Sequence, residues 1–351
     1  MVFIAIIAGA IWGLGHLMKA PVQARLYMLG LLYLAILALH VVLPEGHPLL
    51  ESTGGSLGEW LLLGVLGSVF LGYRTVLRRV RGRAETIEAA RDAAVEPRAR
   101  GLFSDQELER YARHITLPDI GGRGQRALKE AKVLVVGAGG LGSPILLYLA
   151  AAGVGRIGVV DADHVSLSNL QRQVIHTDAR QDMPKVFSAE MSMKALNPSI
   201  EIRPYNRALS EDIAEDLIGE YDLVLDGTDT WEARALINRA AVATGRPVLA
   251  GAISAWEGQV TLYDPAAGAP CMVCVFPQAP KPGMAATCSE TGVIGALPGV
   301  VGTMMALEAV KSLTGAGEGL RGRMLIYDGL NAETRILTLK RKADCPVCGD
   351  I

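Results

Sequence analysis

Excess charge and cysteine are both scarce in this chain. Its 34 basic and 36 acidic residues nearly cancel, so the protein lacks the positive charge excess typical of nucleic-acid-binding proteins. Five cysteines in 351 residues are too few for a disulfide scaffold. Internal repeats are also absent. Nucleic acid is therefore not an expected partner, and a disulfide-rich fold is not expected either.

Charged residues are missing from two apolar stretches near the N-terminus. Half of the chain is apolar and the mean hydropathy is positive, which is unusual for a soluble enzyme. Residues 2–18 and 26–43 contain no Asp, Glu, Lys or Arg. A third run covers residues 57–77 if Glu59 lies at the interface and Arg74 snorkels. Since a bilayer core requires about 20 apolar helical residues, three transmembrane helices are expected within residues 1–77.

Basic residues predict the orientation of these helices. Lys19 and Arg25 lie between the first two runs, whereas residues 44–59 contain no Lys or Arg. Five arginines stand at the end of the third run and just after it, namely Arg74, Arg78, Arg79, Arg81 and Arg83. Positively charged flanks stay in the cytoplasm. We therefore expect a multi-pass protein of the inner cell membrane, with its N-terminus outside and its C-terminal domain in the cytoplasm.

Two other interpretations of the apolar runs stay open. The runs could be buried helices of a soluble domain. The first run could also be a cleaved signal peptide, although it lacks a basic n-region and a convincing small-residue cleavage site. Residues 78–103 follow as a charged, Ala-rich linker or juxtamembrane helix, whose arginines could contact anionic headgroups.

The pattern changes over residues 104–351, where short β-branched runs alternate with helical segments. Strands are expected at 132–136, 156–161, 201–205, 222–226, 247–250, 259–263, 324–327 and 334–339. Helices are expected at 141–152, 185–196, 211–218, 231–244 and 300–313. Such alternation predicts an α/β, Rossmann-like domain with a mostly parallel sheet. The last strands have no helices between them, so they should form an antiparallel extension.

A glycine-rich turn follows the first of these strands. Gly137-Ala138-Gly139-Gly140-Leu141-Gly142 matches the G-x-G-x-x-G pattern between a strand and a helix. Gly137 permits the tight turn, Gly139 lets the backbone approach a phosphate, and Gly142 allows close helix packing. Asp161, at the end of the next strand, is placed to bind ribose hydroxyls. This pattern predicts a nucleotide site but does not separate NAD from ATP.

The residues that follow resemble the MoeB/ThiF/HesA family, the bacterial relatives of the ubiquitin-activating enzymes. The resemblance rests on residues 161–173 (DADHVSLSNLQRQ), 110–115 (RYARHI), 225–230 (LDGTDT) and 286–290 (ATCSE), and on two Cys-x-x-Cys pairs, all in family order. Within the family, the chain is most similar to the molybdopterin-synthase and thiazole sulfur-carrier adenylyltransferases. The resemblance implies an adenylyltransferase that uses ATP and Mg²⁺.

The resemblance also implies roles for particular residues. Asp161 would hold the ribose, Asn169, Arg172 and Lys185 the triphosphate, and Asp229 the magnesium ion. Arg113 would reach a phosphate in the partner subunit of a homodimer. The implied cofactor-binding residues are Gly137, Gly139, Gly140, Gly142, Asp161, Asp163, Ser168, Asn169, Leu170, Gln171, Arg172, Lys185, Asp229 and Thr230. The implied catalytic residues are Arg113, Arg172, Lys185, Asp229 and Cys288.

These residue types suit adenylation, in which a carboxylate oxygen attacks the α-phosphorus of ATP and expels pyrophosphate. Two anions must approach each other, so cations are needed to neutralise the charge. Plainer roles stay open, because Lys185 and Arg172 could be surface residues and Asp229 could cap the following helix. Thr230 departs from the family, which usually has Asn there; the change could alter nucleotide affinity.

The cysteines predict a metal site. Cys271 and Cys274 form one Cys-x-x-Cys pair, and Cys345 and Cys348 form another about 70 residues later. Tetrahedral Zn²⁺ readily takes four thiolates, and by resemblance this zinc is structural. Two redox dithiols are the alternative, but neither pair stands at the start of an evident helix, where the thiol pKa is lowered. Cys288 stands alone; it is either a spare loop cysteine or, by resemblance, a residue that bonds to the carrier protein.

Three functions are compared. The favoured one is adenylation of the C-terminal glycine of a ubiquitin-like sulfur-carrier protein that ends in Gly-Gly, for molybdopterin or thiamine sulfur transfer, with a separate sulfur donor. The second is a membrane-tethered module that binds a ubiquitin-like protein without turnover, for which Thr230 is the only sequence hint. The third, suggested by the glycine turn alone, is an NAD(P)-dependent oxidoreductase.

Overall fold

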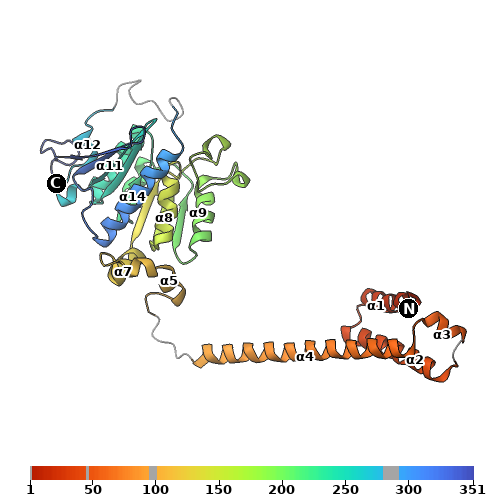
Figure 1. Cartoon of the computed structure of the whole chain (residues 1–351). Coiled ribbons are helices and arrows are strands. Elements are labelled where there is room, and N and C mark those ends of the chain that lie inside the picture. The colour runs from red at the N-terminus through yellow and green to blue at the C-terminus, as the bar shows by residue number, and fades with distance from the viewer. Residues whose placement is uncertain (1, 45–46, 95–100, 280–291) are drawn as a thin grey trace. The chain divides into compact units, whose positions relative to one another are not determined.

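The computed structural model describes residues 2–44, 47–94, 101–279 and 292–351. The chain divides into two compact units, Met1–Ala99 and Arg100–Ile351 (Figure 1). The first unit contains the apolar helices and the second contains the sheet, so each is described by itself.

The N-terminal unit consists of helices. They are α1 (Val2–Leu17), α2 (Val22–Val42), α3 (Pro48–Thr53) and α4 (Leu57–Ala94). The expected runs at 2–18 and 26–43 coincide closely with α1 and α2. The third run, 57–77, is the first part of α4, which continues as one helix through most of the predicted linker, as far as Ala94. The short helix α3, which begins at Pro48, was not expected.

Most described side chains of this unit are exposed although they are apolar. Among its apolar side chains, only Ile36 and Trp60 are buried in the part of the chain that the structure describes. Trp60 joins α2 to α4, because the Tyr33 hydroxyl donates to its carbonyl oxygen at 2.8 Å and the two rings lie 6.4 Å apart. A helix that is apolar on all sides requires an apolar surrounding, either a protein core or a bilayer.

Length and composition identify three candidate membrane spans among the described residues, but they lie in different surroundings. In two of them, Val22–Val42 and Pro48–Leu77, only 6% of the apolar stretch is buried in protein. The third is α14 (Ala296–Thr314), in which 39% is buried, and it packs on the sheet of the second unit. At 16 residues, α1 is shorter than these candidates. The N-terminal unit therefore supplies three apolar helices, and α14 belongs to the core of the second unit.

The second unit is built around one eight-stranded sheet of order β3-β2-β1-β4-β5-β6-β7-β8. The strands are β1 (Lys132–Val136), β2 (Arg156–Val160), β3 (Glu201–Tyr205), β4 (Leu223–Asp226), β5 (Val248–Ile253), β6 (Glu257–Tyr263), β7 (Arg323–Asp328) and β8 (Glu333–Thr338). The first five pair in parallel, and β5 to β8 pair antiparallel. The expected α/β fold with a parallel sheet and an antiparallel extension is confirmed.

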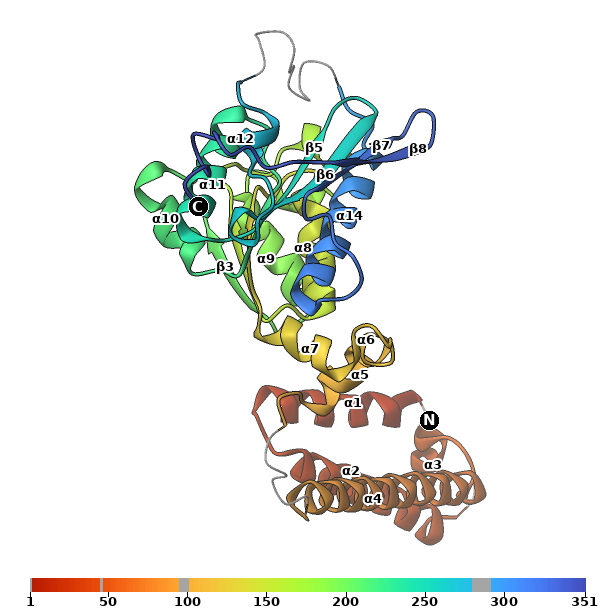
Figure 2. The same ribbon diagram turned by 90° about the vertical axis from the view of Figure 1, so that its left-hand side faces the viewer.

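Helices cover both faces of this sheet (Figures 1 and 2). On one face lie α7 (Gly121–Glu130), α8 (Gly142–Ala152), α9 (Lys185–Leu196) and α14; on the other lie α10 (Glu211–Gly219) and α11 (Trp231–Thr244). Strand β1 illustrates how both faces of the sheet are buried. Val133 and Val135 face the first core, whereas Leu134 and Val136 face the second. A parallel strand buried on both faces is a continuous apolar run.

The segment that begins this unit packs at the edge of the sheet where the parallel strands start. Helix α5 (Asp105–Arg110) begins with a capping box between Ser104 and Glu107, which satisfies its first N–H groups. Helix α6 (Ala112–Ile115) follows. Tyr111 accepts a hydrogen bond from Asn197, just beyond the end of α9, and the first residues of β2 bond to the end of α7. These helices therefore lie at the end of the sheet where the parallel strands begin, opposite to the carboxyl ends of these strands (Figure 1).

Candidate active site

A cleft opens at the carboxyl ends of the parallel strands. Strand β1 lies between β2 and β4, so the connections from the two ends of the sheet diverge here, and ligands of open α/β sheets bind at such a point. The cleft has a volume of about 370 Å³, within the range of small-molecule sites. Its wall is formed by the glycine turn after β1, residues 161–163 after β2, 207–209 after β3 and 227–230 after β4.

The glycine turn has the tight geometry that its sequence predicts. Gly137 has a φ of +97°, which side-chain-bearing residues rarely adopt. A Cβ on Gly142 would lie 2.0 Å from the carbonyl oxygen of Gly137, so only glycine allows α8 to start this close. Asp161 braces the turn, because its carboxylate accepts the N–H of Ala138 at 2.8 Å. The turn thus presents its backbone to the cleft in a fixed shape.

A buried histidine ties this turn to α9. Nε2 of His176 lies 2.9 Å from the carbonyl oxygen of Ala138, and Nδ1 lies 2.9 Å from the hydroxyl of Ser188. Because a carbonyl only accepts, Nε2 carries the proton, and Nδ1 accepts from the hydroxyl. Burial lowers the pKa of His176, so the ring is neutral at physiological pH. It fixes the glycine turn relative to the helix that begins at Lys185.

Two of the three cations predicted to reach phosphate, Lys185 and Arg172, line the cleft. Lys185 is only 4% exposed, and its Nζ lies 2.8 Å from Asp163. A buried ammonium group requires an anionic partner, and Asp163 at the rim supplies it. Arg172 donates from Nη2 to the side-chain oxygen of Asn169 at 2.8 Å. Asn169 itself is not in the cleft wall, so it affects this site by holding the guanidinium group of Arg172.

Not every predicted cofactor-binding residue lies in the cleft wall. Gly137, Gly139, Gly140, Asp161, Asp163, Arg172, Lys185, Asp229 and Thr230 do. Ser168, Asn169, Leu170 and Gln171 lie just outside it, in and after the short 3₁₀ helix Leu167–Asn169. Gln171 packs against Gly295, where a Cβ would come within 2.2 Å of its Oε1. Gly142 does not line the cleft; its role is to let α8 begin close to the carbonyl oxygen of Gly137.

Asp229 and Thr230 have separate positions at the start of α11. The Thr230 hydroxyl accepts the N–H of Ala233 at 3.3 Å, which makes Thr230 the N-cap of this helix. The interpretation of Asp229 as the cap is therefore wrong. Among the described residues, no hydrogen bond or ion pair engages the Asp229 carboxylate, which lines the cleft. Since Thr is also a good N-cap, the departure from Asn leaves the helix start intact.

Four polar residues of the cleft wall were not among the predicted site residues, namely Gln173, Arg207, Thr228 and Arg234. Gln173 lies inside the motif that was quoted, two residues after the chosen Gln171. Arg234 donates from Nη2 to the carbonyl oxygens of Thr228 (2.6 Å) and Gly251 (3.0 Å), which joins the loop after β4 to β5. Nothing in the local sequence marks Arg207 or Arg234, because strand order alone brings them to the cleft.

A buried carboxylate supports the loop that carries Asp229. Asp226 ends β4, is 2% exposed and accepts from the N–H (2.9 Å) and hydroxyl (2.6 Å) of Thr228. Burial raises its pKa, and the positive charge of Arg234 opposes that rise. These contacts fix the turn between β4 and α11.

Arg113 and Cys288 are not part of this cleft as described. Arg113 lies in α6, which packs against α7 at the opposite edge of the sheet. Cys288 lies outside the described residues.

The comparisons with known proteins agree with this architecture. The model of the ThiF family matches residues 111–347. The chain belongs to the ThiF family. A sulfur carrier protein adenylyltransferase of Thermus thermophilus is 46% identical over 252 residues, which are 71% of this chain and 93% of that protein. The adenylyltransferase and sulfurtransferase MOCS3 of Mus musculus is 47% identical over 251 residues.

The extent of the matches differs between these relatives. The MOCS3 match covers 71% of this chain but 54% of MOCS3. Among solved structures, Escherichia coli MccB with ATP has a TM-score of 0.60 at 20% identity, covering 69% of this chain and 75% of MccB. That likeness shows the fold. Both sequence relatives are named adenylyltransferases, and this ThiF-family chain is an enzyme of the same class, which uses ATP.

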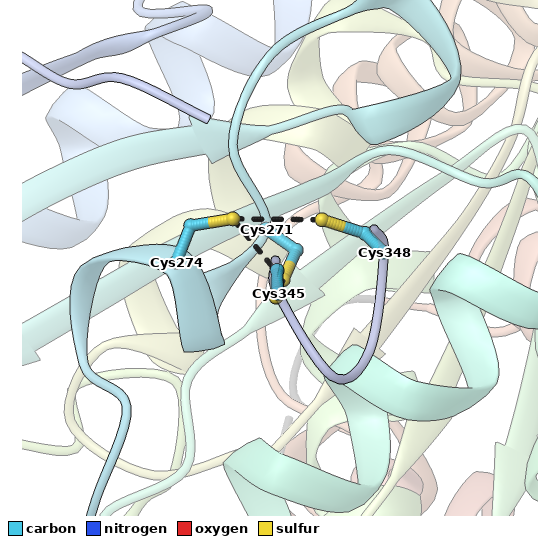
Figure 3. A group of neighbouring side chains, drawn as sticks. All are labelled: Cys271, Cys274, Cys345 and Cys348. Atoms are coloured by element: carbon cyan, nitrogen blue, oxygen red, sulfur yellow. Dashed lines mark hydrogen bonds between the residues drawn. The ribbon is translucent and has the colours of Figure 1, made fainter. Parts of the chain in front are cut away.

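The four paired cysteines of this ThiF-family domain form one cluster (Figure 3). Their sulfur atoms all lie within 4.8 Å of one another, with Cys271 and Cys345 3.6 Å apart and Cys274 and Cys348 3.5 Å apart. All four side chains are buried. These two contacts link one pair to the other, and the sulfur atoms of Cys271 and Cys274 lie 4.0 Å apart within the first pair. The four thiols therefore form one cluster rather than two separate dithiols. Contrary to expectation, Cys271 does begin a helix, the four-residue α12 (Met272–Val275).

The cluster has the chemistry of a structural zinc site. Four thiolates in a closed shell are a common tetrahedral Zn²⁺ set. Burial raises the pKa of the Cys271 thiol, so without a cation it stays neutral; a bound Zn²⁺ would hold the thiolate form. The cluster could therefore bind zinc, and a metal here would join the C-terminal tail to the segment after β6.

Proposed function

We propose that this enzyme adenylates the C-terminal glycine carboxylate of a ubiquitin-like sulfur-carrier protein, for molybdopterin or thiamine sulfur transfer. The observation that carries the proposal is the cleft, whose wall combines the glycine turn, the predicted cations Lys185 and Arg172 and the Asp229 carboxylate. One carboxylate oxygen of the carrier forms a bond to the α-phosphorus of ATP. The bond from that phosphorus to the pyrophosphate oxygen breaks, and the electron pair leaves with pyrophosphate.

Each charged residue then has a defined task. Lys185 and Arg172 neutralise the phosphates while the anionic carboxylate approaches. Asp229 would hold Mg²⁺, an ion that binds through one or two carboxylates and substrate phosphates. Asp161 would bind the ribose. Its carboxylate also accepts the N–H of Asp163 at 2.8 Å, so ribose binding and the shape of this wall depend on each other.

ATP–pyrophosphate exchange tests this function. The full chain, Mg²⁺, ATP and a carrier ending in Gly-Gly should convert labelled pyrophosphate into labelled ATP. The same carrier without its last glycine should support none, because the attacking carboxylate is then displaced. Exchange that is equal with both carriers would contradict the proposal.

The position of Arg113 supports a homodimer with shared sites. Helix α6 lies at the edge of the sheet opposite to the cleft, so this arginine is remote from the cleft of its own subunit. A second copy would have to bring its own Arg113 to the phosphates. This inference makes the enzyme an obligate dimer for catalysis.

Co-expression of two inactive variants measures this directly. Arg113→Ala and Asp229→Asn should each be nearly inactive alone. In randomly mixed two-fold dimers, half are mixed and each mixed dimer has one complete site, so activity should return to about a quarter of the wild type. No recovery in mixed dimers that are shown to form would mean that Arg113 does not act across the interface.

We also propose that α1, α2 and the first part of α4 span the inner membrane, with residues 104–351 in the cytoplasm. The exposed apolar surface of the N-terminal unit and the arginines after residue 73 support this orientation. Alkaline carbonate should leave the full chain in the membrane pellet. A C-terminal epitope should resist protease in intact spheroplasts and be digested after lysis. Release by carbonate, or digestion of the epitope before lysis, would contradict the topology.

A further inference from the structure

Helix α4 is longer than a membrane span requires. It covers Leu57–Ala94 as one helix, and Figure 1 shows it running past α1, α2 and α3. In the topology proposed above the span ends near residue 77, so residues 78–94 add about 26 Å of helix outside the membrane. Isolated helices of this length are marginal in water, and Gly82 lowers the helix propensity further. This segment therefore requires a packing partner.

The larger apolar residues of this segment share one side of the helix. Over residues 77–94, only Leu77, Val80 and Ile87 are apolar and larger than alanine. Their spacings of three and seven residues place them at the a and d positions of one heptad repeat, and Ala84 occupies the a position between the last two. Such a seam is typical of a helix that pairs with another helix in a coiled coil.

The same register extends back into the membrane-spanning part of α4. Phe70 and Tyr73 occupy the preceding a and d positions. Phe70 is 62% exposed, Tyr73 63% and Leu77 49%, so the described helices of this chain leave this stripe of α4 uncovered. Lipid can cover the stripe as far as residue 77, but beyond that point an apolar seam needs protein. A second helix would cover both parts of the seam.

Building on the membrane spans and the homodimer proposed above, we infer that residues 70–90 of α4 form a parallel two-stranded coiled coil with the same helix of a second copy. Two copies inserted in one orientation present their α4 helices in parallel on the same side of the membrane. The charges fit this partner. Arg83, at g, lies opposite Glu88 of the partner subunit, at e of the next heptad, and the pair occurs twice by symmetry. Arg81, at e, lies opposite the partner's Val76, at g, so no like-charge pair forms there.

The coiled coil has a defined end and a consequence for the site. Arg91 occupies the next a position, where a charged residue costs stability, so pairing ends before it. Joining two chains through their anchors raises the effective concentration of one catalytic domain for the other. The partner's Arg113 would then be available even where the catalytic domains attract each other weakly.

Cysteine cross-linking of the full chain in membranes tests the register. In a Cys288→Ser background, Ala84→Cys and Ile87→Cys place a thiol on the seam, whereas Glu85→Cys and Ala89→Cys place one at the outer b and f positions. Under mild oxidation the seam variants should form disulfide-linked dimers about 10-fold faster than the outer variants, because a and d residues face their counterparts. Equal rates at all four positions would mean mere proximity, and no cross-linking would mean a single helix or one that lies on the lipid surface. Either result would overturn the inference.

A second comparison keeps the cysteine fixed and changes the seam. Adding Ile87→Glu to the Ala84→Cys chain should slow its cross-linking about 10-fold, because two unpaired carboxylates would enter the apolar seam. Ala89→Glu is the matched control and should leave the rate unchanged; equal slowing by both would overturn the inference. ATP–pyrophosphate exchange in the same membranes reports the proposed function separately. Exchange without seam cross-linking would contradict the coiled coil alone, and seam cross-linking without exchange would contradict the proposed activity alone.

Discussion

Replacing Asp229 by Asn is expected to reduce ATP–pyrophosphate exchange by about 10³-fold, on the scale of removing a principal transition-state electrostatic group. The substitution keeps the shape of the side chain but removes the charge proposed to hold Mg²⁺. Without the metal, the attacking carboxylate meets a triphosphate that has lost the charge of Mg²⁺ and is neutralised by protein cations such as Lys185 and Arg172 alone. The fold should be unaffected, because Thr230 rather than Asp229 caps α11.

The control for this experiment is Asp216→Asn, at an exposed acidic residue of α10 outside the cleft wall. It removes the same charge from the same domain and should keep wild-type exchange. Melting curves of both variants should match the wild type. If Asp229→Asn retained full exchange at saturating Mg²⁺, Asp229 would not be the metal ligand.

Replacing Cys345 by Ser should remove zinc and lower the melting temperature of the C-terminal domain by about 10 °C. Structural zinc contributes folding free energy directly, and for a domain of this size each kcal/mol shifts Tm by roughly 2–4 °C. The metal would join Cys345 and Cys348 of the tail to Cys271 and Cys274. Without it, the residues after β8 lose their main attachment, and three buried thiols are left without a cation.

Zinc content by plasma mass spectrometry, measured beside Tm, tests this prediction. Cys288→Ser provides the matched control for metal content, since Cys288 is the one cysteine outside the two pairs. It should retain one zinc per chain. An unchanged Tm in Cys345→Ser after verified loss of the metal would show that the cluster is not structural.

The sheet and the glycine turn were predictable because their signals are local. A run such as Lys132–Val136 is apolar on both faces, and the turn after it requires glycine at Gly137 and Gly142 for steric reasons visible in the sequence. The predicted bounds of β1, β3, α9 and α11 coincide with the observed ones. The family assignment, made from several motifs in one order, is confirmed by the match over residues 111–347.

Other features depend on contacts between distant segments, which the sequence does not display. Arg207 and Arg234 enter the cleft only because β3, β4 and β5 end at the same edge. Which residue caps α11 depended on local geometry, since Asp229 and Thr230 are both good caps. The continuation of α4 to Ala94 could not be separated from a linker by composition. The four-cysteine cluster was predictable from its spacing, whereas the contacts that cross between its pairs were not.

The central claim is that a carboxylate oxygen of the carrier attacks the α-phosphorus of ATP, and isotope transfer tests it most directly. A carrier whose terminal carboxylate contains ¹⁸O should be incubated with the full chain and Mg²⁺–ATP, and the product cleaved with hydroxylamine at its carbonyl carbon. The account predicts AMP that contains one ¹⁸O atom, together with free pyrophosphate. Release of ADP and phosphate, or AMP without the label, would contradict it.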